Sequence, residues 1–251
     1  MPDRKKFLNC LQVFPIAEMN SVIHISLKHR YVFVEMPKVA SSTIKLRLMN
    51  HEALGLDVKI GNPHPTPLES PFVKPYQLDR QGLTDIMEDP VFLKFCFVRN
   101  PFTRILSAYL DKIARSEREK RQILRHLGHD PNDLSRDVSF RDFLSTLKTM
   151  PRAQMDKHWR PQALQSFSPY LTHGFIGKFE HIDRDLKRLS NLVGLDLVTE
   201  ATVHNAHKTA ASDKLGEYYD DECVALLTEI YAQDFKQFGY GPQLPGSDKG
   251  A

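Results

Sequence analysis

The chain has 251 residues, of which 41% are hydrophobic, and this is enough apolar material to bury a sizeable core in one domain. Its 34 basic and 31 acidic residues leave a formal charge of only +3, which argues against a general nucleic-acid binder. Three widely spaced cysteines, Cys10, Cys96 and Cys223, fit neither a disulfide framework nor a metal-ligand pattern and indicate free thiols. No run of about 18 apolar residues occurs, so no transmembrane segment is predicted.

The first predicted strand covers residues 31–34, YVFV, a run of aromatic and β-branched side chains typical of a buried strand. An amphipathic helix is predicted after it from the apolar residues Ile44, Leu46 and Leu48. Such a strand–turn–helix unit points the first helical N–H groups outward, which favours a bound phosphate or sulfate.

The turn itself is polar and carries Lys38, Ser41, Ser42 and Thr43, which suit an anion site. Residues 35–45 contain no glycine, and the pattern G-x-x-x-x-G-K-[ST] is absent, so an ordinary ATP or GTP site is disfavoured. The alternative is that the hydroxyl residues cap the helix and Lys38 is an ordinary solvated charge.

A second strand–turn–helix unit is predicted further along the chain. The Pro-rich residues 61–82 indicate a long surface loop. Residues 91–98, VFLKFCFV, then predict a buried strand that leads directly into a helix with Pro101 in its first turn. The later segments predict a solvated charged face at 115–126, a capping box from Ser139 to Asp142, a strand at 174–179, a helix at 183–192, a loop at 198–214 and a helix at 220–238.

The two units predict an α/β fold with a doubly wound parallel sheet, which holds ligands at the carboxyl ends of its strands. Arg99 ends the second strand, and Ser107 lies about two helical turns further on. The guanidinium fork suits a phosphate, and a helical hydroxyl can add one hydrogen bond to it. The alternative is that Arg99 forms a salt bridge with a carboxylate at the edge of the core.

These motifs resemble those of a known enzyme family. PKVASSTIK at 37–45 and FVRNPFTRILSAYLDK at 97–112 are similar to the nucleotide-binding motifs of the carbohydrate sulfotransferases, in the branch of the HNK-1 and chondroitin 4-O-sulfotransferases. Three further segments follow in the same order: KHWRPQ at 157–162, FIGKFEHIDRDL at 175–186 and EIYAQDFKQFGY at 229–240. The resemblance covers about four fifths of the chain.

The resemblance implies a single P-loop-like sulfotransferase domain over residues 1–251, with a helical, loop-rich acceptor region. It implies that the chain uses 3′-phosphoadenosine 5′-phosphosulfate (PAPS) as sulfuryl donor and no metal. The first motif would hold the 5′-phosphosulfate through Lys38, Ser41, Ser42 and Thr43, with Lys45 as a further candidate, and the second would hold the 3′-phosphate through Arg99 and Ser107. Lys208 lies where the family places a loop over the nucleotide, although an ordinary solvated lysine would look the same.

The expected reaction transfers the sulfuryl group in line to an acceptor hydroxyl, and Lys38 is the candidate for stabilising the charge on the leaving phosphate. A base must also take the hydroxyl proton. We favour His158, beside Trp159, which can stack on a sugar; His64 is the competitor, and Glu69 and Asp85 stay open. The alternative for His158 is that the His–Trp pair is a packing motif.

The expected acceptor is a carbohydrate hydroxyl, including that of an acidic polysaccharide or a glycolipid. The alternatives are sulfation of another alcohol or of tyrosine, and a catalytically silent protein that binds a nucleotide or glycan. Asn100 replaces the acidic residue usual in the family after the arginine, and most of the cysteines of the secreted animal enzymes are missing. Both features favour a bacterial or cytoplasmic member, the alternative being a lumenal domain trimmed from a Golgi protein.

Overall fold

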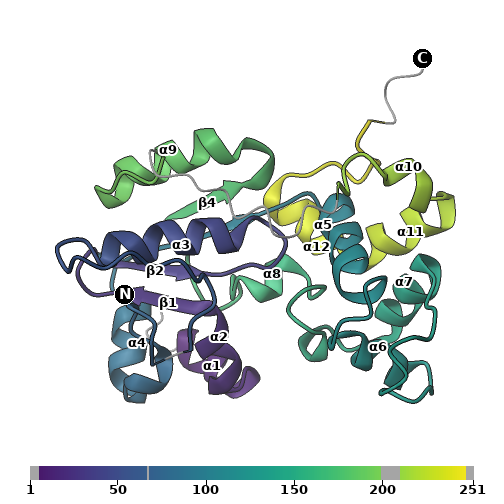
Figure 1. Ribbon diagram of the computed structural model, residues 1–251, viewed down its shortest axis with the longest axis horizontal. Coiled ribbons are helices and arrows are strands. Elements are labelled where there is room, and N and C mark those ends of the chain that lie inside the picture. The colour runs from purple at the N-terminus through teal and green to yellow at the C-terminus, as the bar shows by residue number, and fades with distance from the viewer. Residues whose placement is uncertain (1–5, 67, 199–209, 247–251) are drawn as a thin grey trace. The chain divides into compact units, whose positions relative to one another are not determined.

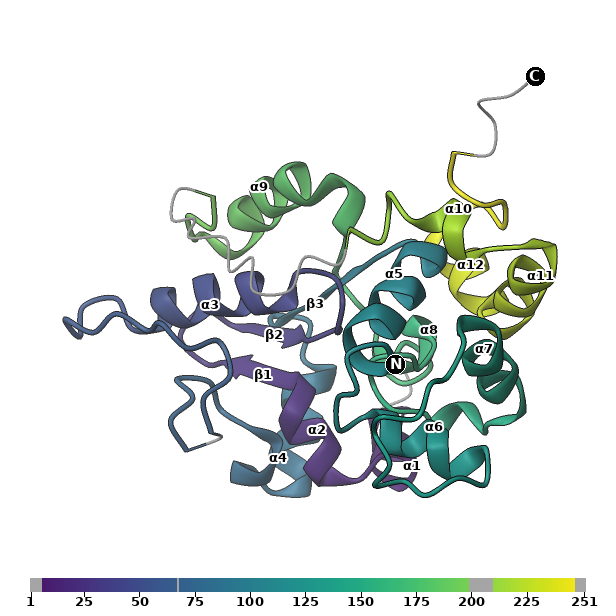
Figure 2. The ribbon, with the colours of Figure 1, turned by 45° about the vertical axis from the view of Figure 1, so that its right-hand side comes forward.

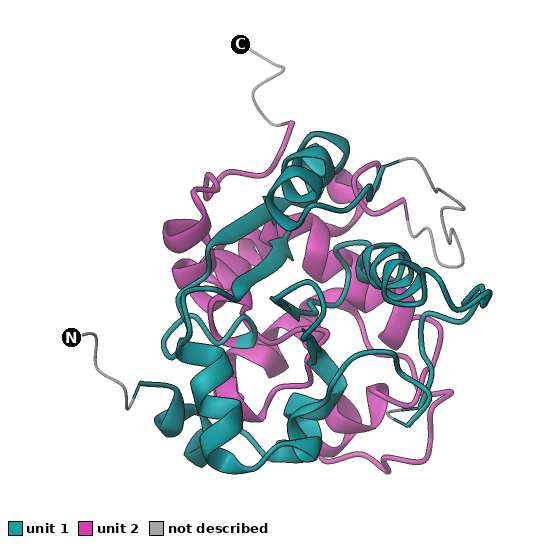
Figure 3. Ribbon diagram, turned by 90° about the vertical axis from the view of Figure 1, so that its left-hand side faces the viewer, with its two compact units in different colours: residues 1–98, 165–204 teal, residues 99–164, 205–251 magenta. Residues whose placement is uncertain are grey.

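The computed structural model of the protein describes residues 6–66, 68–198 and 210–246. The chain divides into two compact units: residues 1–98 with 165–204, and residues 99–164 with 205–251 (Figure 3). That the whole chain acts as a single sulfotransferase domain stays a prediction.

The first unit is built on a four-stranded sheet with strand order β1-β2-β3-β4 (Figure 1). The strands are β1 (Ile23–Ser26), β2 (Tyr31–Val34), β3 (Leu93–Val98) and β4 (Phe175–Lys178). β2, β3 and β4 are parallel neighbours, with Phe33 paired to Phe95 and Phe95 to Phe175, whereas β1 runs antiparallel to β2. The predicted α/β class and the parallel pairing of the two strands are confirmed, and the antiparallel edge strand is an addition.

Helices cover both faces of this sheet (Figures 1 and 2). On one side lie α3 (Ser41–Glu52) and α9 (Ile182–Val193), and on the other α1 (Lys6–Val13), α2 (Ile16–Val22) and α4 (Arg80–Glu88). Because side chains alternate along a strand, Tyr31, Phe33, Phe95 and Phe97 share one face. They form a core with residues of α3 and α9, namely Ile44, Leu48, Met49, Leu186 and Leu189.

The described part of the second unit is helical. Its helices are α5 (Pro101–Ala108), continued by a π-helical turn (Tyr109–Ile113), α6 (Lys120–His126), α7 (Phe140–Thr149), α10 (Leu215–Tyr218), α11 (Asp221–Ile230) and α12 (Ala232–Phe238). A short helical turn lies at Arg152–Gln154, and the four-residue helix α8 (Gln162–Gln165) has its first three residues in this unit. Two further short helical turns, Pro75–Gln77 and Phe179–His181, belong to the first unit. The core of the unit includes Phe102, Phe143, Trp159, Tyr231 and Phe235.

Several local predictions are confirmed, and others need correction. Pro101 opens α5, and Ser139 caps α7 by accepting from the Asp142 N–H while donating to its carboxylate. The loop predicted at 61–82 ends earlier, because α4 begins at Arg80 after the Asp79 cap. The charged segment 115–126 is more than a solvated face, because α6 buries Ile123 and Leu124. The helix predicted at 220–238 is interrupted at Tyr231.

No helix within the described ranges is long and apolar enough to cross a membrane.

Candidate functional site

The turn after β2 adopts a left-handed backbone although it has no glycine. Lys38 has φ 71° and Ala40 has φ 62°, while Val39 between them is outside the left-handed region. Such alternation is typical of backbone nests, in which successive N–H groups converge on an anion. A non-glycine residue held in this region costs about 1–3 kcal/mol, and strain of this kind concentrates at functional sites.

The hydroxyl residues of the first motif lie in the first turn of α3. The N-cap residue is Ala40, and among the described contacts no side chain caps the helix. The alternative, that Ser41, Ser42 and Thr43 serve as the cap, is therefore wrong. Ser41 and Thr43 are buried and Ser42 is half-buried, and all three stand at the end of the helix where an anion is favoured.

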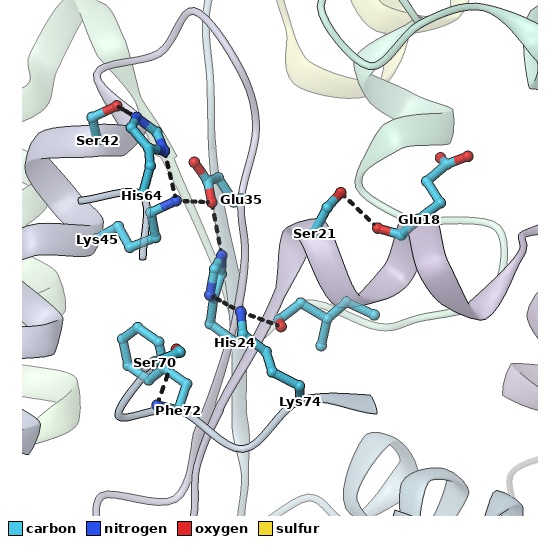
Figure 4. A network of polar contacts seen from close by, with 11 residues as sticks. Glu18, Ser21, His24, Glu35, Ser42, Lys45, His64, Ser70, Phe72 and Lys74 are labelled. Atoms are coloured by element: carbon cyan, nitrogen blue, oxygen red, sulfur yellow. Dashed lines mark hydrogen bonds and ion pairs between the residues drawn. The ribbon is translucent and has the colours of Figure 1, made fainter. Parts of the chain in front are cut away.

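A chain of polar contacts runs from the first turns of α3 into the interior of the first unit (Figure 4). The carboxylate of Glu35 accepts a hydrogen bond from Lys45 Nζ at 2.6 Å and contacts His24 Nε2 at 2.7 Å through the same Oε2 atom. The opposite ring nitrogen of His24, Nδ1, lies 2.7 Å from Lys74 Nζ. All four residues are buried, so charged groups are concentrated inside the protein.

The chain of contacts reaches the surface at His64, in the Pro-rich loop. His64 Nδ1 lies 3.4 Å from Lys45 Nζ, and its Nε2 lies 3.0 Å from Ser42 Oγ. A pocket of about 200 Å³ opens beside this network, and it is lined by Asn20, Ser21, His24, Lys45, Met49, His64, Pro65, Ser70 and Lys74. It is smaller than the ~300–1,000 Å³ of pockets that hold drug-sized ligands. It therefore suits one functional group or sugar ring and not a whole nucleotide.

The protonation of the buried groups follows from their neighbours. Burial alone would raise the pKa of Glu35, but its contacts with His24 and Lys45 outweigh burial and hold the pKa below the ordinary value. Burial lowers the pKa of His24 from 6.5 to about 4; the hydrogen bond with Glu35 opposes this change, and the charge of Lys74 adds to it. At neutral pH the network therefore contains an ionised Glu35 and a neutral His24.

We expect His24 to make the protein sensitive to acid. The unfolded chain binds a proton at His24 near pH 6.5 and the folded chain only near pH 4. The contribution of neutral His24 to the free energy of unfolding is thus fully present above pH 6.5. It is lost as the pH falls toward 4, and the free energy of unfolding falls by about 3 kcal/mol. Urea unfolding at several pH values measures this loss.

The matched variant is His24→Gln, which keeps a donor and an acceptor but does not titrate. Its free energy of unfolding is expected to fall less between pH 6.5 and pH 4.5. The free energy of unfolding of the variant will still decrease with falling pH, because burial also lowers the pKa of His173 to about 4. If the free energy of unfolding falls equally with pH in the wild type and the variant, His24 is not the group responsible.

The second motif begins in the second unit at Arg99, which is 7% exposed. Its Nε donates to Thr103 Oγ1 at 2.9 Å, one turn into α5. The Gln162 side chain forms two hydrogen bonds with the backbone of Arg99. The Arg99 N–H donates to Gln162 Oε1, and Gln162 Nε2 donates to the Arg99 carbonyl, both at 2.8 Å. Ser107, on α5, is also buried, at 3% exposure.

Gln162 is held in turn by Asp234, on α12. The Asp234 carboxylate accepts the backbone N–H groups of Gln162 and Ala163, each at 2.8 Å. Arg104, which is fully buried on α5, donates to the carbonyls of Lys157 and Arg160. The segments around residues 160 and 234 thus support the backbone from which the Arg99 side chain extends.

His158 and Trp159 occupy different environments. Trp159 is fully buried and packs edge-on against Phe143, so the expectation that it stacks on a sugar is wrong. His158 is half-buried, and its Nδ1 lies 2.6 Å from the Asp156 carboxylate. A carboxylate on one ring nitrogen can orient a histidine base, so His158 keeps the chemistry required for that role.

The structure brings together part of the predicted site. Lys38, Ser41, Ser42, Thr43 and Lys45 lie on one turn and helix of the first unit, with His64 joined to them. Arg99, Ser107 and His158 belong to the second unit, and Lys208 lies outside the described residues. Of the other base candidates, Glu69 accepts hydrogen bonds from Thr66, and Asp85 accepts one from Gln81 on the exposed side of α4.

Sequence reasoning missed the residues that support this site, namely His24, Glu35, Lys74, Gln162 and Asp234. The one available signal for the first group was a glutamate, Glu35, directly after an otherwise apolar strand. Gln162 and Asp234 stand in the segments KHWRPQ and EIYAQDFKQFGY, but nothing in those segments shows that the two side chains meet.

Comparison with known proteins agrees with the motifs. The profile of the sulfotransferase family matches residues 22–241. Carbohydrate sulfotransferase 14 of Danio rerio is 26% identical over 248 residues, covering 90% of this chain and 64% of the relative. The Mus musculus protein of the same name is 25% identical over 259 residues (94% and 65%), and carbohydrate sulfotransferase 11 of Rattus norvegicus is 22% identical over 231 residues (84% and 65%).

The chain thus spans slightly less than two thirds of the length of these relatives. No solved structure gives a significant match. Because the family profile covers most of the chain, from β1 to the end of α12, the protein belongs to the sulfotransferase family.

Proposed function

We propose that the protein transfers the sulfuryl group of PAPS to a hydroxyl group of a carbohydrate. The observation that carries the proposal is the glycine-free, nest-like turn at Lys38 and Ala40, followed by three hydroxyl residues at the start of α3, in a chain of the sulfotransferase family. Such a turn suits a single phosphosulfate. The names of the relatives support a carbohydrate acceptor.

In the proposed reaction the acceptor oxygen attacks sulfur and forms a new S–O bond. The bond between sulfur and the oxygen bridging to the 5′-phosphate breaks, and its electron pair stays on that phosphate oxygen. Lys38, which is half-buried on the turn, is proposed to stabilise this charge, with Ser41, Ser42 and Thr43 binding the phosphosulfate. Arg99 and Ser107 are proposed to bind the 3′-phosphate.

A base must accept the proton of the acceptor hydroxyl, and we assign this role to His64. His64 is exposed and is joined to the first motif through Ser42, so it combines access with proximity to the residues proposed to bind the phosphosulfate. His158 with Asp156 is the second candidate. Comparing His64→Ala with His158→Ala separates the two, because only loss of the base should abolish turnover while leaving nucleotide binding intact.

The test of the donor class is calorimetric binding of 3′-phosphoadenosine 5′-phosphate, with ATP and AMP as controls. We expect selective binding that Arg99→Ala weakens at least tenfold, since the variant loses a charged hydrogen-bond donor for the 3′-phosphate. Arg99→Lys keeps the charge without the fork and should lie between the two. Equal binding of ATP, or no binding, would refute the proposal.

The acceptor class needs a panel assayed with PAPS: desulfated chondroitin, desulfated dermatan, a simple alcohol and a tyrosine peptide. Transfer to a glycan supports the proposal, whereas transfer to the alcohol or the peptide alone supports the alternative acceptors. Binding of the nucleotide without any transfer supports a silent binding protein. A cytoplasmic location also stays a proposal, supported by three buried cysteines that are not in disulfides.

A further inference from the structure

The proton positions in the network around Glu35 follow from which groups can donate. A lysine ammonium has only donors, so Lys74 must donate to Nδ1 of His24. The proton of the neutral His24 ring is then on Nε2 and is donated to Glu35. Glu35 accepts this bond and a second from Lys45, and both bonds end on its Oε2 atom.

The position of the proton on His64 likewise follows from its donor neighbour. Lys45 donates toward His64 Nδ1, so this nitrogen carries the lone pair, and Nε2 carries the proton and donates to Ser42 Oγ. Protonating Nδ1 would replace the bond from Lys45 by a contact between two cations. Nδ1 is therefore the atom of the neutral ring that can accept a proton, and Lys45 must give way when it does so.

We propose that Glu35 is a positioning residue for the transfer step. Its carboxylate anchors Lys45 where the ammonium selects the Nε2–H form of His64, and His24 with Lys74 holds the carboxylate in place. Glu35 is itself 7% exposed and reaches His64 only through Lys45, so it acts without touching substrate. This inference rests on the proposed function insofar as it concerns catalysis, but the proton arrangement can be tested independently.

The variant that tests the proposal is Glu35→Gln, which keeps the shape of the side chain but removes the charge that anchors Lys45. The matched control is Glu52→Gln. Glu52 lies in the same unit, at the end of α3, and accepts a hydrogen bond from Tyr31 Oη at 2.9 Å, but it has no contact with the network. Thermal unfolding of both variants shows whether they fold.

The first readout is the ¹⁵N NMR spectrum of the imidazole rings, which distinguishes the two neutral forms of histidine. In the wild type and in Glu52→Gln we expect the proton of the neutral His64 ring on Nε2. In Glu35→Gln we expect a mixture of the Nε2–H and Nδ1–H forms. The second readout is turnover on the acceptor identified by the panel. In Glu35→Gln we expect kcat to fall on the order of tenfold, with the KM for PAPS changed less than threefold and binding of 3′-phosphoadenosine 5′-phosphate retained.

Each outcome bears on the proposal. Unchanged His64 resonances in a folded Glu35→Gln variant would overturn it, as would a kcat equal to that of Glu52→Gln. A wild type without transfer to any acceptor would refute the proposed function, while a change of the His64 form in Glu35→Gln would still support the positioning contact. If Glu35→Gln does not fold, Lys45→Met, which removes the same link from the other side, must change the His64 form, or the proposal fails.

Discussion

Lys38→Ala is expected to lose sulfuryl transfer by on the order of 100- to 1,000-fold while folding normally. Removing one preorganised group that stabilises charge in a transition state typically costs about 3–4 kcal/mol of activation free energy. Alanine at position 38 would have the same left-handed backbone as the lysine, which has φ 71°, so we expect the free energy of unfolding to change by less than about 1 kcal/mol. Steady-state turnover and urea unfolding measure the two effects.

Two further variants give this experiment its controls. Lys38→Gly also lacks the ammonium but removes the Cβ that disfavours a positive φ, so it should be as inactive as Lys38→Ala and at least as stable. Lys59→Ala removes an exposed lysine from the same unit and should keep full activity. Activity in either Lys38 variant close to that of Lys59→Ala would refute the role of Lys38 in catalysis.

Glu35→Ala is expected to lower the free energy of unfolding by about 3–5 kcal/mol. The variant leaves the Lys45 ammonium, only 7% exposed as a side chain, without its carboxylate. Glu52→Ala is the comparison, because Glu52 also accepts one side-chain hydrogen bond but is not an ion-pair partner of a buried lysine; its loss should be nearer 1 kcal/mol.

A double-mutant cycle separates the ion pair from the packing of the side chain. In Glu35→Ala/Lys45→Met the unpaired buried charge is gone, so the double variant should be more stable than the sum of the single effects predicts. The difference is the coupling energy between the two residues. Additive losses would show that Glu35 stabilises the fold by some other contact than the one with Lys45.

Many of the strands and helices can be predicted from the local sequence pattern. Buried strands such as residues 31–34 and 93–98 are marked by mostly apolar side chains, and Pro101 and Ser139 mark where helices begin. Strand β1 was not predicted, because an alternation of apolar and polar side chains over only four residues is a weak signal. Its place in the sheet depends on pairing with β2.

The support of the candidate site is harder to predict, for a physical reason. His24 and Lys74 are 50 residues apart, and Gln162 and Asp234 are 72 apart. Their pairing depends on the folded path of the chain and not on local sequence. Buried polar and charged side chains of this kind also contradict the rule that such residues are mostly exposed, so composition alone assigns them to the surface. The residues nearest the proposed donor site could be predicted because the family motifs are contiguous.

The glycine-free turn has a consequence for the thermodynamics of donor binding. Residues with a Cβ explore fewer backbone conformations than glycine, so a turn built from Lys38, Val39 and Ala40 has less conformational entropy to lose when it is ordered around an anion. The conformational entropy of the turn is therefore lost mainly during folding, before the nucleotide binds. Nucleotide binding at this turn should therefore carry a small entropic penalty, and affinity should weaken less on warming than it would with glycine at positions 38 and 40.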